Sequence, residues 1–166
     1  MFTFGSKSRA YLNELLGRRP AARARLQGDA NHSALSGDVS FYPVNGGVLV
    51  LAEVQGLPMA TGNCPGRFFG FHIHEGGACT GTQAEPFADA KGHLNPGGCP
   101  HPQHAGDLPP LYGGKGQAWS AFFTDRFTIG EILGRTVILH SGPDDFTTQP
   151  AGNSGSRIAC GVIRAV

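Results

Sequence analysis

The sequence has few charged residues and no long apolar or helical run. Only 15% of its 166 residues are charged, and no segment repeats apolar residues at helical spacing over many turns. No apolar stretch approaches the roughly 20 residues that a transmembrane helix needs. The longest early apolar group, Leu15-Leu16, is too short for a secretory signal. These absences exclude a membrane-spanning protein and a helical bundle, and they make the cytoplasm the default location.

Basic charge is concentrated at the N-terminus. Residues 1–25 contain six Lys or Arg and one acidic residue, whereas the remainder contains 7 basic and 11 acidic residues. No nucleic-acid recognition motif accompanies the basic residues. We therefore expect residues 1–20 to form a solvated basic extension rather than a nucleic-acid or anionic-membrane contact. Residues 11–16 are compatible with one or two turns of amphipathic helix.

Short apolar runs separated by Gly, Pro, Asn and Asp predict an all-β domain over residues 21–166. Asn45-Gly46 suits the positive φ angles of a type I′ turn and therefore predicts a hairpin. The apolar runs predict strands at residues 21–27, 37–41, 48–54, 67–74, 117–124, 136–140 and 157–164. Two long loops, residues 76–114 and 141–156, interrupt them. This pattern is typical of an eight-stranded Greek-key β-barrel or sandwich.

Histidines form the most informative pattern, because five of the seven fall within residues 71–107. His72 and His74 are one residue apart on an expected strand, so alternation places both imidazoles on one face, away from the core. The other candidate ligands are His93, His101, His104, Asp107 and His140. Six imidazoles and a carboxylate exceed what one tetrahedral site uses. Since imidazole suits copper and zinc, two adjacent sites that share one histidine would account for the set.

Five motifs resemble those of the copper/zinc superoxide dismutases. They are, in chain order, residues 70–75 (GFHIHE), 92–96 (GHLNP), 104–108 (HAGDL), 134–140 (GRTVILH) and 155–163 (GSRIACGVI). The resemblance extends from about residue 21 to the C-terminus. The five-residue spacing from His74 to Cys79 is similar to that of the bacterial branch of the family.

The resemblance implies a copper site, a zinc site and the residues that serve them. The implied copper ligands are His72, His74, His93 and His140. The implied zinc ligands are His93, His101, His104 and Asp107, so that His93 bridges the two metals. Asp144 matches the carboxylate that links ligands of the two sites. Arg157 matches the arginine that attracts and orients the superoxide anion.

The implied activity is conversion of superoxide to oxygen and hydrogen peroxide by alternate reduction and oxidation of copper. Members of the family occur as monomers and as homodimers, so both states remain open. Two rival functions also remain, namely storage or sensing of copper or zinc on the same fold, and hydrolysis by a zinc enzyme. The hydrolytic function is the more distant, because His74-Glu75 lacks the helical His-Glu-x-x-His spacing.

Four cysteines allow two disulfides. Disulfides are typical of oxidising compartments, which conflicts with the absence of a secretory signal. The resemblance implies one disulfide, between Cys79 and Cys160. Cys64 and Cys99 have no counterparts in the usual pattern, and we expect a second disulfide between them. The alternatives are that Cys99 is a soft metal ligand or that both residues are buried thiols.

Two loops also depart from the family pattern. Only two residues separate His101 from His104, which makes the zinc loop short. The loop after His140 contains no lysine. Attraction of the anion is therefore expected to depend on Arg157.

Overall fold

The structure is a computed structural model and describes residue 14 and residues 17–60 and 66–166. Most of the expected N-terminal extension, including nearly all of the helix expected at residues 11–16, lies outside the described residues. The domain boundary at residue 20 therefore stays a prediction. None of the helices in the described ranges is long and apolar enough to cross a membrane.

The described residues form short strands and three brief helical segments. The strands are β1 (Ala22–Gly28), β2 (Ser36–Val44), β3 (Gly47–Gln55), β4 (Arg67–Phe69), β5 (Phe71–His74), β6 (Leu111–Gly113), β7 (Gln117–Thr124), β8 (Thr136–His140) and β9 (Arg157–Ala165). The helical segments are the 3-10 turns η1 (Ala30–His32) and η2 (Ala88–Ala90) and the single-turn α2 (Ile129–Ile132).

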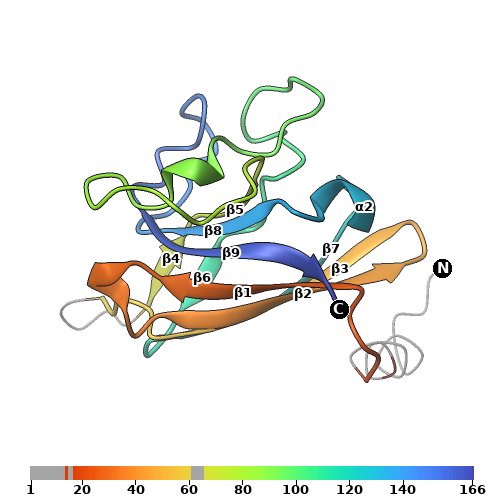
Figure 1. Cartoon of the computed structure of the whole chain (residues 1–166), viewed down its shortest axis with the longest axis horizontal. Helices are drawn as coiled ribbons and strands as arrows, with labels where there is room; N and C mark the ends of the chain where they lie inside the picture. Colours follow the sequence, from red (N-terminus) through yellow and green to blue (C-terminus); the bar gives the residue numbers. More distant parts are fainter. Residues whose placement is uncertain (1–13, 15–16, 61–65) are drawn as a thin grey trace.

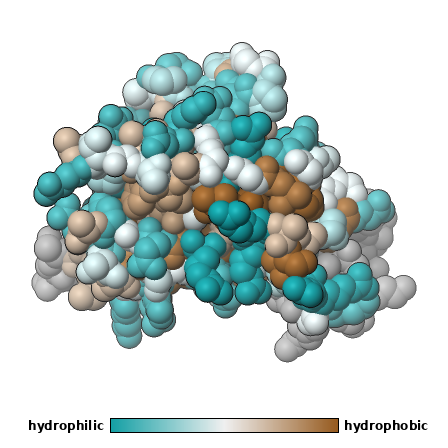
Figure 2. All heavy atoms as spheres, viewed as in Figure 1, coloured by the Kyte–Doolittle hydropathy of each residue, from teal (hydrophilic) through white to brown (hydrophobic). Residues whose placement is uncertain are grey.

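The strands form a curled antiparallel sheet in the order β5-β8-β9-β1-β2-β3-β7, and a β4-β6 pair completes it. A bridge between Gly114 and Gln117 joins β6 to β7. Because β4 continues into β5, the two edges of the sheet are connected, which confirms the all-β Greek-key barrel. Figure 1 shows the long loops on one side, next to β5 and β8. On the face seen in Figure 2, hydrophilic residues predominate over these loops and hydrophobic residues gather over the strands.

Gly70 divides the strand expected at residues 67–74 into β4 and β5. A Cβ at this position would lie 2.6 Å from Ser154 Oγ, in the loop between β8 and β9, so only glycine allows the loop to approach this closely. The Gly70 N–H donates to Gly142 O (2.7 Å), and the His140 N–H donates to Gly70 O (2.8 Å). The break in the strand therefore places β5 beside the end of β8 that carries His140.

The structure corrects two details of the segments between the expected strands. Residues 111–113, which were expected within a loop, form β6 and pair with β4. A strand of three residues is too short to produce an alternating pattern in the sequence. The turn α2 was not expected either, although Thr128 and Glu131 form the capping box that begins it.

The core lies inside the barrel and is built from alternate residues of the strands. In β3, every second residue from Val48 to Val54 is buried. In β5, Phe71 and Ile73 enter the same core and are fully buried. Burial of each such side chain stabilises the fold by about 1.5–3 kcal/mol. The residues between them in β5 face the opposite way, towards the long loops.

Candidate metal centre

The seven groups that the sequence singled out come together beside β5 and β8. They are His72 and His74 on β5, His140 at the end of β8, and His93, His101, His104 and Asp107 in the loop between β5 and β6. All seven are buried, with exposed fractions of 9% or less. The structure thus brings together every metal ligand that the sequence predicted.

The edge of β5 that does not pair with β8 is covered by the loop that carries the other ligands. The Ile73 N–H donates to Gly106 O (2.9 Å), and the Leu94 N–H donates to Ile73 O (2.8 Å). A Cβ on Gly106 would lie 2.1 Å from Ile73 O, so this approach also requires glycine. Both edges of the histidine strand are therefore fixed, which limits movement of the two imidazoles that it carries.

Four histidines form the first cluster. One ring nitrogen from each of His72, His74, His93 and His140 lies within 4.8 Å of the others. The Nε2 atoms of His74 and His140 are 3.3 Å apart. The rings of His72 and His93 are also close, with centroids 4.0 Å apart. An all-histidine set of this kind suits copper.

Hydrogen bonds to backbone carbonyls show which ring nitrogen carries the proton in two of these histidines. His74 Nδ1 donates to Lys91 O (2.8 Å), and His140 Nδ1 donates to Gly155 O (3.2 Å). Because a carbonyl oxygen only accepts, each Nδ1 carries the proton, and a neutral ring then has a lone pair on Nε2. Two such lone pairs face each other at 3.3 Å. This arrangement fits a cation bound between them.

Three histidines and one carboxylate form the second cluster, which consists of His93, His101, His104 and Asp107. Asp107 Oδ1 lies 2.7 Å from His93 Nδ1, and its Oδ2 lies 3.0 Å from His101 Nδ1 and 3.2 Å from His104 Nδ1. The contact with His101 lacks hydrogen-bond geometry, so His101 Nδ1 is a buried atom without a hydrogen-bond partner among the described residues. Three imidazoles and a carboxylate suit zinc.

His93 belongs to both clusters. Its Nδ1 faces Asp107 at 2.7 Å. Its Nε2, on the other side of the ring, is buried without a hydrogen-bond partner in the described part of the chain, and so is His72 Nδ1. Buried polar atoms are rarely left unpaired. An imidazole that has lost both ring protons offers one nitrogen to each of two metals, so these unpaired atoms fit a bridged pair of metal ions.

Asp144 connects the two clusters through hydrogen bonds to one histidine of each. Its Oδ2 accepts a hydrogen bond from His72 Nε2 (2.7 Å), and its Oδ1 accepts from His101 Nε2 (2.9 Å) and from the Phe146 N–H (2.7 Å). Burial disfavours the charged form of Asp144 and by itself would raise its pKa. The hydrogen bonds favour the charged form more strongly, so the pKa of Asp144 is held well below its usual range. Burial likewise disfavours the charged form of Asp107, but the hydrogen bond with His93 outweighs burial and lowers the pKa of Asp107. Both carboxylates are therefore charged at neutral pH.

Burial lowers the pKa values of three histidines in the first cluster. The pKa of His140 falls to about 3, through burial and then through the neighbouring charge of His72. The pKa of His74 falls well below its ordinary value through burial and then through the neighbouring charges of His93 and His140. The pKa of His72 is also lowered by burial, although its hydrogen bond to Asp144 opposes the shift. Neutral rings result, and metal binding requires them.

The metal-free protein is expected to lose stability as the pH falls below about 6.5. An unfolded histidine has a pKa of about 6.5, whereas burial lowers the pKa of folded His140 to about 3. Between these values the unfolded state binds more protons, so acid favours unfolding. The unfolding temperature of the metal-free protein should therefore fall as the pH is lowered from about 7 to about 4. The His140→Gln variant should show a weaker dependence, and a pH-independent unfolding temperature would contradict the prediction.

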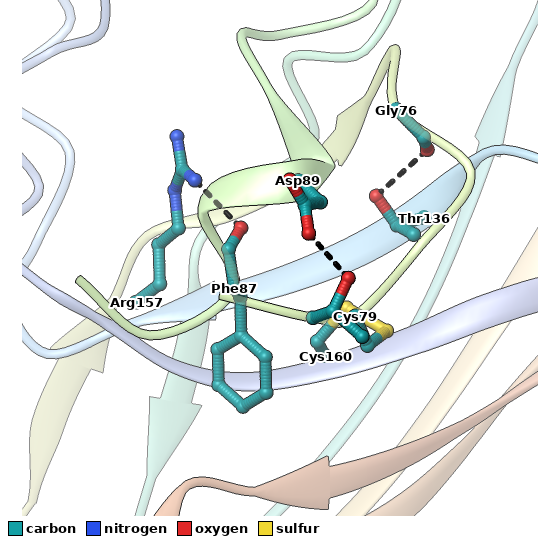
Figure 3. Close-up of a disulfide and its surroundings, with 8 residues drawn as sticks. Gly76, Cys79, Phe87, Asp89, Thr136, Arg157 and Cys160 are labelled. Carbon is teal, nitrogen blue, oxygen red and sulfur yellow. Dashed lines mark hydrogen bonds between the residues drawn. A yellow bond between two sulfur atoms is a disulfide. The ribbon is translucent and has the colours of Figure 1, made fainter. Parts of the chain in front are cut away.

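A hollow of about 480 Å³ opens beside the first cluster, and its lining includes His74, His93, His140 and Arg157. Arg157 donates from Nη1 to Phe87 O (2.7 Å) and from Nη2 to a second backbone carbonyl, that of Lys91 (2.7 Å). Figure 3 shows the first of these contacts. The two carbonyls fix the guanidinium group at the hollow, where its positive charge favours an anion.

Cys79 and Cys160 form the disulfide that the resemblance implied (Figure 3). It joins the loop after β5 to β9, across a sequence separation of 81 residues. Near it, Thr136 Oγ1 donates to Gly76 O (3.1 Å), which ties the start of the same loop to β8. The disulfide therefore helps to hold the segment whose carbonyls orient Arg157.

The second expected disulfide, between Cys64 and Cys99, stays a prediction. Cys64 lies outside the described residues, and Cys99 is an exposed free thiol. Cys99 is absent from both ligand clusters of the described chain, which does not favour its being a metal ligand. Its exposure also does not fit the alternative of a buried thiol.

Three groups around the site were missed by the sequence reasoning. Lys91 O accepts hydrogen bonds from both His74 and Arg157, but the position of a backbone carbonyl leaves no trace in a sequence. Gln149 and Arg126 bind the backbone of the loop that carries the second cluster. Neither lies in one of the five motifs, and isolated Gln and Arg residues give no signal of a long-range contact.

The structure combines a Greek-key β-barrel with two ligand clusters that share one imidazole. This combination defines a class of binuclear metalloproteins, in which one site suits copper and the other suits zinc. The family model for copper/zinc superoxide dismutase (SODC) matches residues 35–163. The chain belongs to this family, and it converts superoxide to oxygen and hydrogen peroxide with copper and zinc as its metals.

Relatives from two bacteria match most of the chain. Copper/zinc superoxide dismutase 2 of Aquifex aeolicus is 40% identical over 143 residues, which cover 77% of this chain and 78% of the relative. Copper/zinc superoxide dismutase 1 of the same organism is 36% identical over 143 residues, covering 77% and 79%. The copper/zinc superoxide dismutase of Deinococcus radiodurans is 35% identical over 166 residues, covering 89% of this chain and 86% of the relative.

Proposed function

We propose specific roles for the residues of the metal centre in superoxide dismutation. His72, His74, His93 and His140 bind copper. His93, His101, His104 and Asp107 bind zinc. The observation that carries this assignment is the position of His93, whose Nδ1 faces Asp107 and whose Nε2 is buried and unpaired among the described residues.

Copper, when bound, supplies the one-electron oxidation and reduction that convert two superoxide anions and two protons to oxygen and hydrogen peroxide. Arg157 draws the anion into the hollow and orients it there. With copper reduced, His93 would hold a proton at Nε2 in place of the metal, and its Nδ1 would stay on the side of Asp107. Asp144 accepts hydrogen bonds from His72 and thereby fixes the tautomer and orientation of that ring.

Metal analysis combined with a superoxide-consumption assay tests these roles. The form that holds both metals is expected to consume superoxide rapidly, and the zinc-only form is expected to be inactive. The His101→Ala variant should lose zinc while its copper site remains occupied. Tight copper binding without turnover would instead favour storage or sensing of copper on the same fold.

Replacing Arg157 with Gln is expected to lower the rate constant for superoxide by about tenfold, since a positive charge at a hollow can raise association rates by 10-fold or more. The rate should also become less sensitive to salt, because electrostatic attraction is screened by ions. Arg157→Lys keeps the charge and should retain most of the salt dependence. Arg164→Gln, at the exposed end of β9, is the matched control. Unchanged salt dependence in Arg157→Gln would contradict the role.

We also propose that the chain forms a homodimer through an aromatic patch on the outer face of β4, β6 and β7. The patch consists of Phe68, Tyr112, Trp119 and Phe123, each more than half exposed. Phe68 and Tyr112 are paired across β4 and β6, and their ring centroids are 5.1 Å apart. Two such patches would bury about 900 Å² in total, which approaches the lower end of specific interfaces. Exposed aromatic clusters of this kind typically mark interfaces.

Sedimentation of the protein tests the homodimer. The unaltered chain is expected to sediment with twice the mass of one chain, and Trp119→Glu is expected to sediment as a monomer, because it places a charge within the patch. Met59→Glu changes an exposed apolar residue outside the patch and should leave the dimer intact. If the unaltered chain is a monomer at high protein concentration, the homodimer is wrong.

A further inference from the structure

The segment that carries three ligands of the second cluster, residues 98–109, contains no helix or strand. Hydrogen bonds within the segment are few, and include the Gln103 N–H to Pro100 O (2.8 Å). Its ligands His101, His104 and Asp107 are nevertheless buried and closely grouped. Their backbone must therefore be held in part by groups from elsewhere in the chain.

Gln149, in the loop between β8 and β9, holds the backbone of His101. The His101 N–H donates to Gln149 Oε1 (3.0 Å), and Gln149 Nε2 donates to His101 O (2.7 Å). One side-chain amide thus pairs with both backbone groups of one residue, as a neighbouring strand would. This pairing fixes the peptide planes on each side of His101 and so the direction of its side chain.

The same loop also holds the far side of the His101 ring. Asp144 Oδ1 accepts a hydrogen bond from His101 Nε2 (2.9 Å). Gln149 and Asp144 therefore hold His101 at its backbone and at its ring, and neither contact uses His101 Nδ1. That atom remains directed at the second cluster, where it is buried without a hydrogen-bond partner in the described residues.

Arg126, in the turn after β7, holds the other two ligands through their carbonyl groups. Its Nη1 donates to Pro102 O (3.1 Å), to His104 O (3.3 Å) and to Asp107 O (3.3 Å). A guanidinium group donates without accepting and keeps its charge, so it gathers three carbonyl oxygens that would otherwise repel one another. The backbone on both sides of His104 is thereby tied to the barrel.

We infer that Gln149 and Arg126 are positioning residues that determine the zinc affinity of the second cluster. Loss of an outer partner of a metal ligand typically costs 10–100-fold in affinity. Here the two side chains order the backbone of three ligands before the metal arrives, so binding does not have to order it. The inference rests on the proposed assignment of zinc to this cluster.

The test measures zinc affinity by competition with a chelator, using the full chain with its disulfide intact. Gln149→Leu and Arg126→Met are each expected to weaken zinc binding by about 10-fold or more. Copper affinity, titrated in the absence of zinc, is expected to change by less than about threefold, because neither residue contacts a ligand that belongs to the first cluster alone. Arg126→Lys keeps a donor and should recover part of the affinity.

Matched controls distinguish positioning from general stabilisation. Gln103→Leu is the control for Gln149→Leu, because it replaces an exposed glutamine within residues 98–109 whose side chain forms no hydrogen bond among the described residues. Arg164→Met is the control for Arg126→Met, because it removes an exposed arginine of β9. Both should leave zinc affinity unchanged. If Gln149→Leu and Arg126→Met leave zinc affinity unchanged, or weaken zinc and copper equally while lowering the unfolding temperature of the metal-free protein, the inference is wrong.

A double variant separates this inference from the proposed zinc site. In a His101→Ala background, Gln149→Leu should reduce zinc affinity little further, because the ligand that it positions is already absent. An additive effect would contradict positioning through His101. If His101→Ala and His104→Ala both leave zinc affinity at the level of the unaltered chain, the proposed zinc site itself is wrong.

Discussion

Replacement of His140 with Ala is expected to reduce copper-dependent superoxide consumption by more than about 100-fold, beyond the 10–100-fold typical of lost outer partners. His140 comes from β8, whereas the other three members of its cluster come from β5 and the adjoining loop. Its Nε2 lies 3.3 Å from His74 Nε2, and its Nδ1 is committed to Gly155 O. No other described side chain takes its place, so the remaining three histidines leave one side of the site open.

The measurements are copper content after dialysis and superoxide consumption at saturating copper. His32→Ala is the matched control, because His32 is the one histidine outside both clusters and its Nδ1 lies 2.7 Å from Asp29 Oδ1 at the cap of η1. It should retain full activity. Retention of activity by His140→Ala, or equal losses in the two variants, would show that the first cluster is not the redox site.

Replacement of Cys79 and Cys160 with Ser is expected to lower the free energy of unfolding by about 4 kcal/mol, as the chain-entropy model gives for a closed loop of this length. The disulfide closes a sequence separation of 81 residues. For a chain of this size, about 4 kcal/mol corresponds to a fall of about 10 °C in the unfolding temperature. Calorimetry of the metal-free protein at neutral pH measures this fall.

The disulfide should also affect the substrate hollow. It anchors the loop that contains Phe87 and Lys91, whose carbonyls hold Arg157. The doubly substituted variant is therefore expected to lose part of its salt dependence along with its stability. Cys99→Ser, which leaves the Cys79–Cys160 disulfide intact, should retain the salt dependence. An unfolding temperature equal to that of the unaltered chain would mean that loop closure contributes little here.

The fold and the shared face of His72 and His74 could be predicted because they depend on local patterns. Alternation in β3 and the Asn45-Gly46 turn each reflect a period or a backbone angle that neighbouring residues determine. The pair His72 and His74 likewise shares a face by strand geometry alone. Local patterns of this kind survive in a single sequence.

Other parts of the site depend on contacts between distant segments. The division of the strand at Gly70 results from the approach of Ser154, 84 positions later in the chain. The contacts of Gln149 with His101 and of Arg126 with three carbonyls join loops that no periodicity relates. Such contacts become visible only when the chain is folded.

Asp144 has a thermodynamic consequence for metal binding at the two clusters. One carboxylate holds His72 of the first cluster through Oδ2 and His101 of the second through Oδ1. Under the proposed assignment, occupancy of either cluster is therefore expected to change the free energy of ordering in the other. By reciprocity, the factor by which zinc changes copper affinity must equal the factor by which copper changes zinc affinity. Under the proposed assignment, we therefore expect the two sites to fill as one coupled equilibrium.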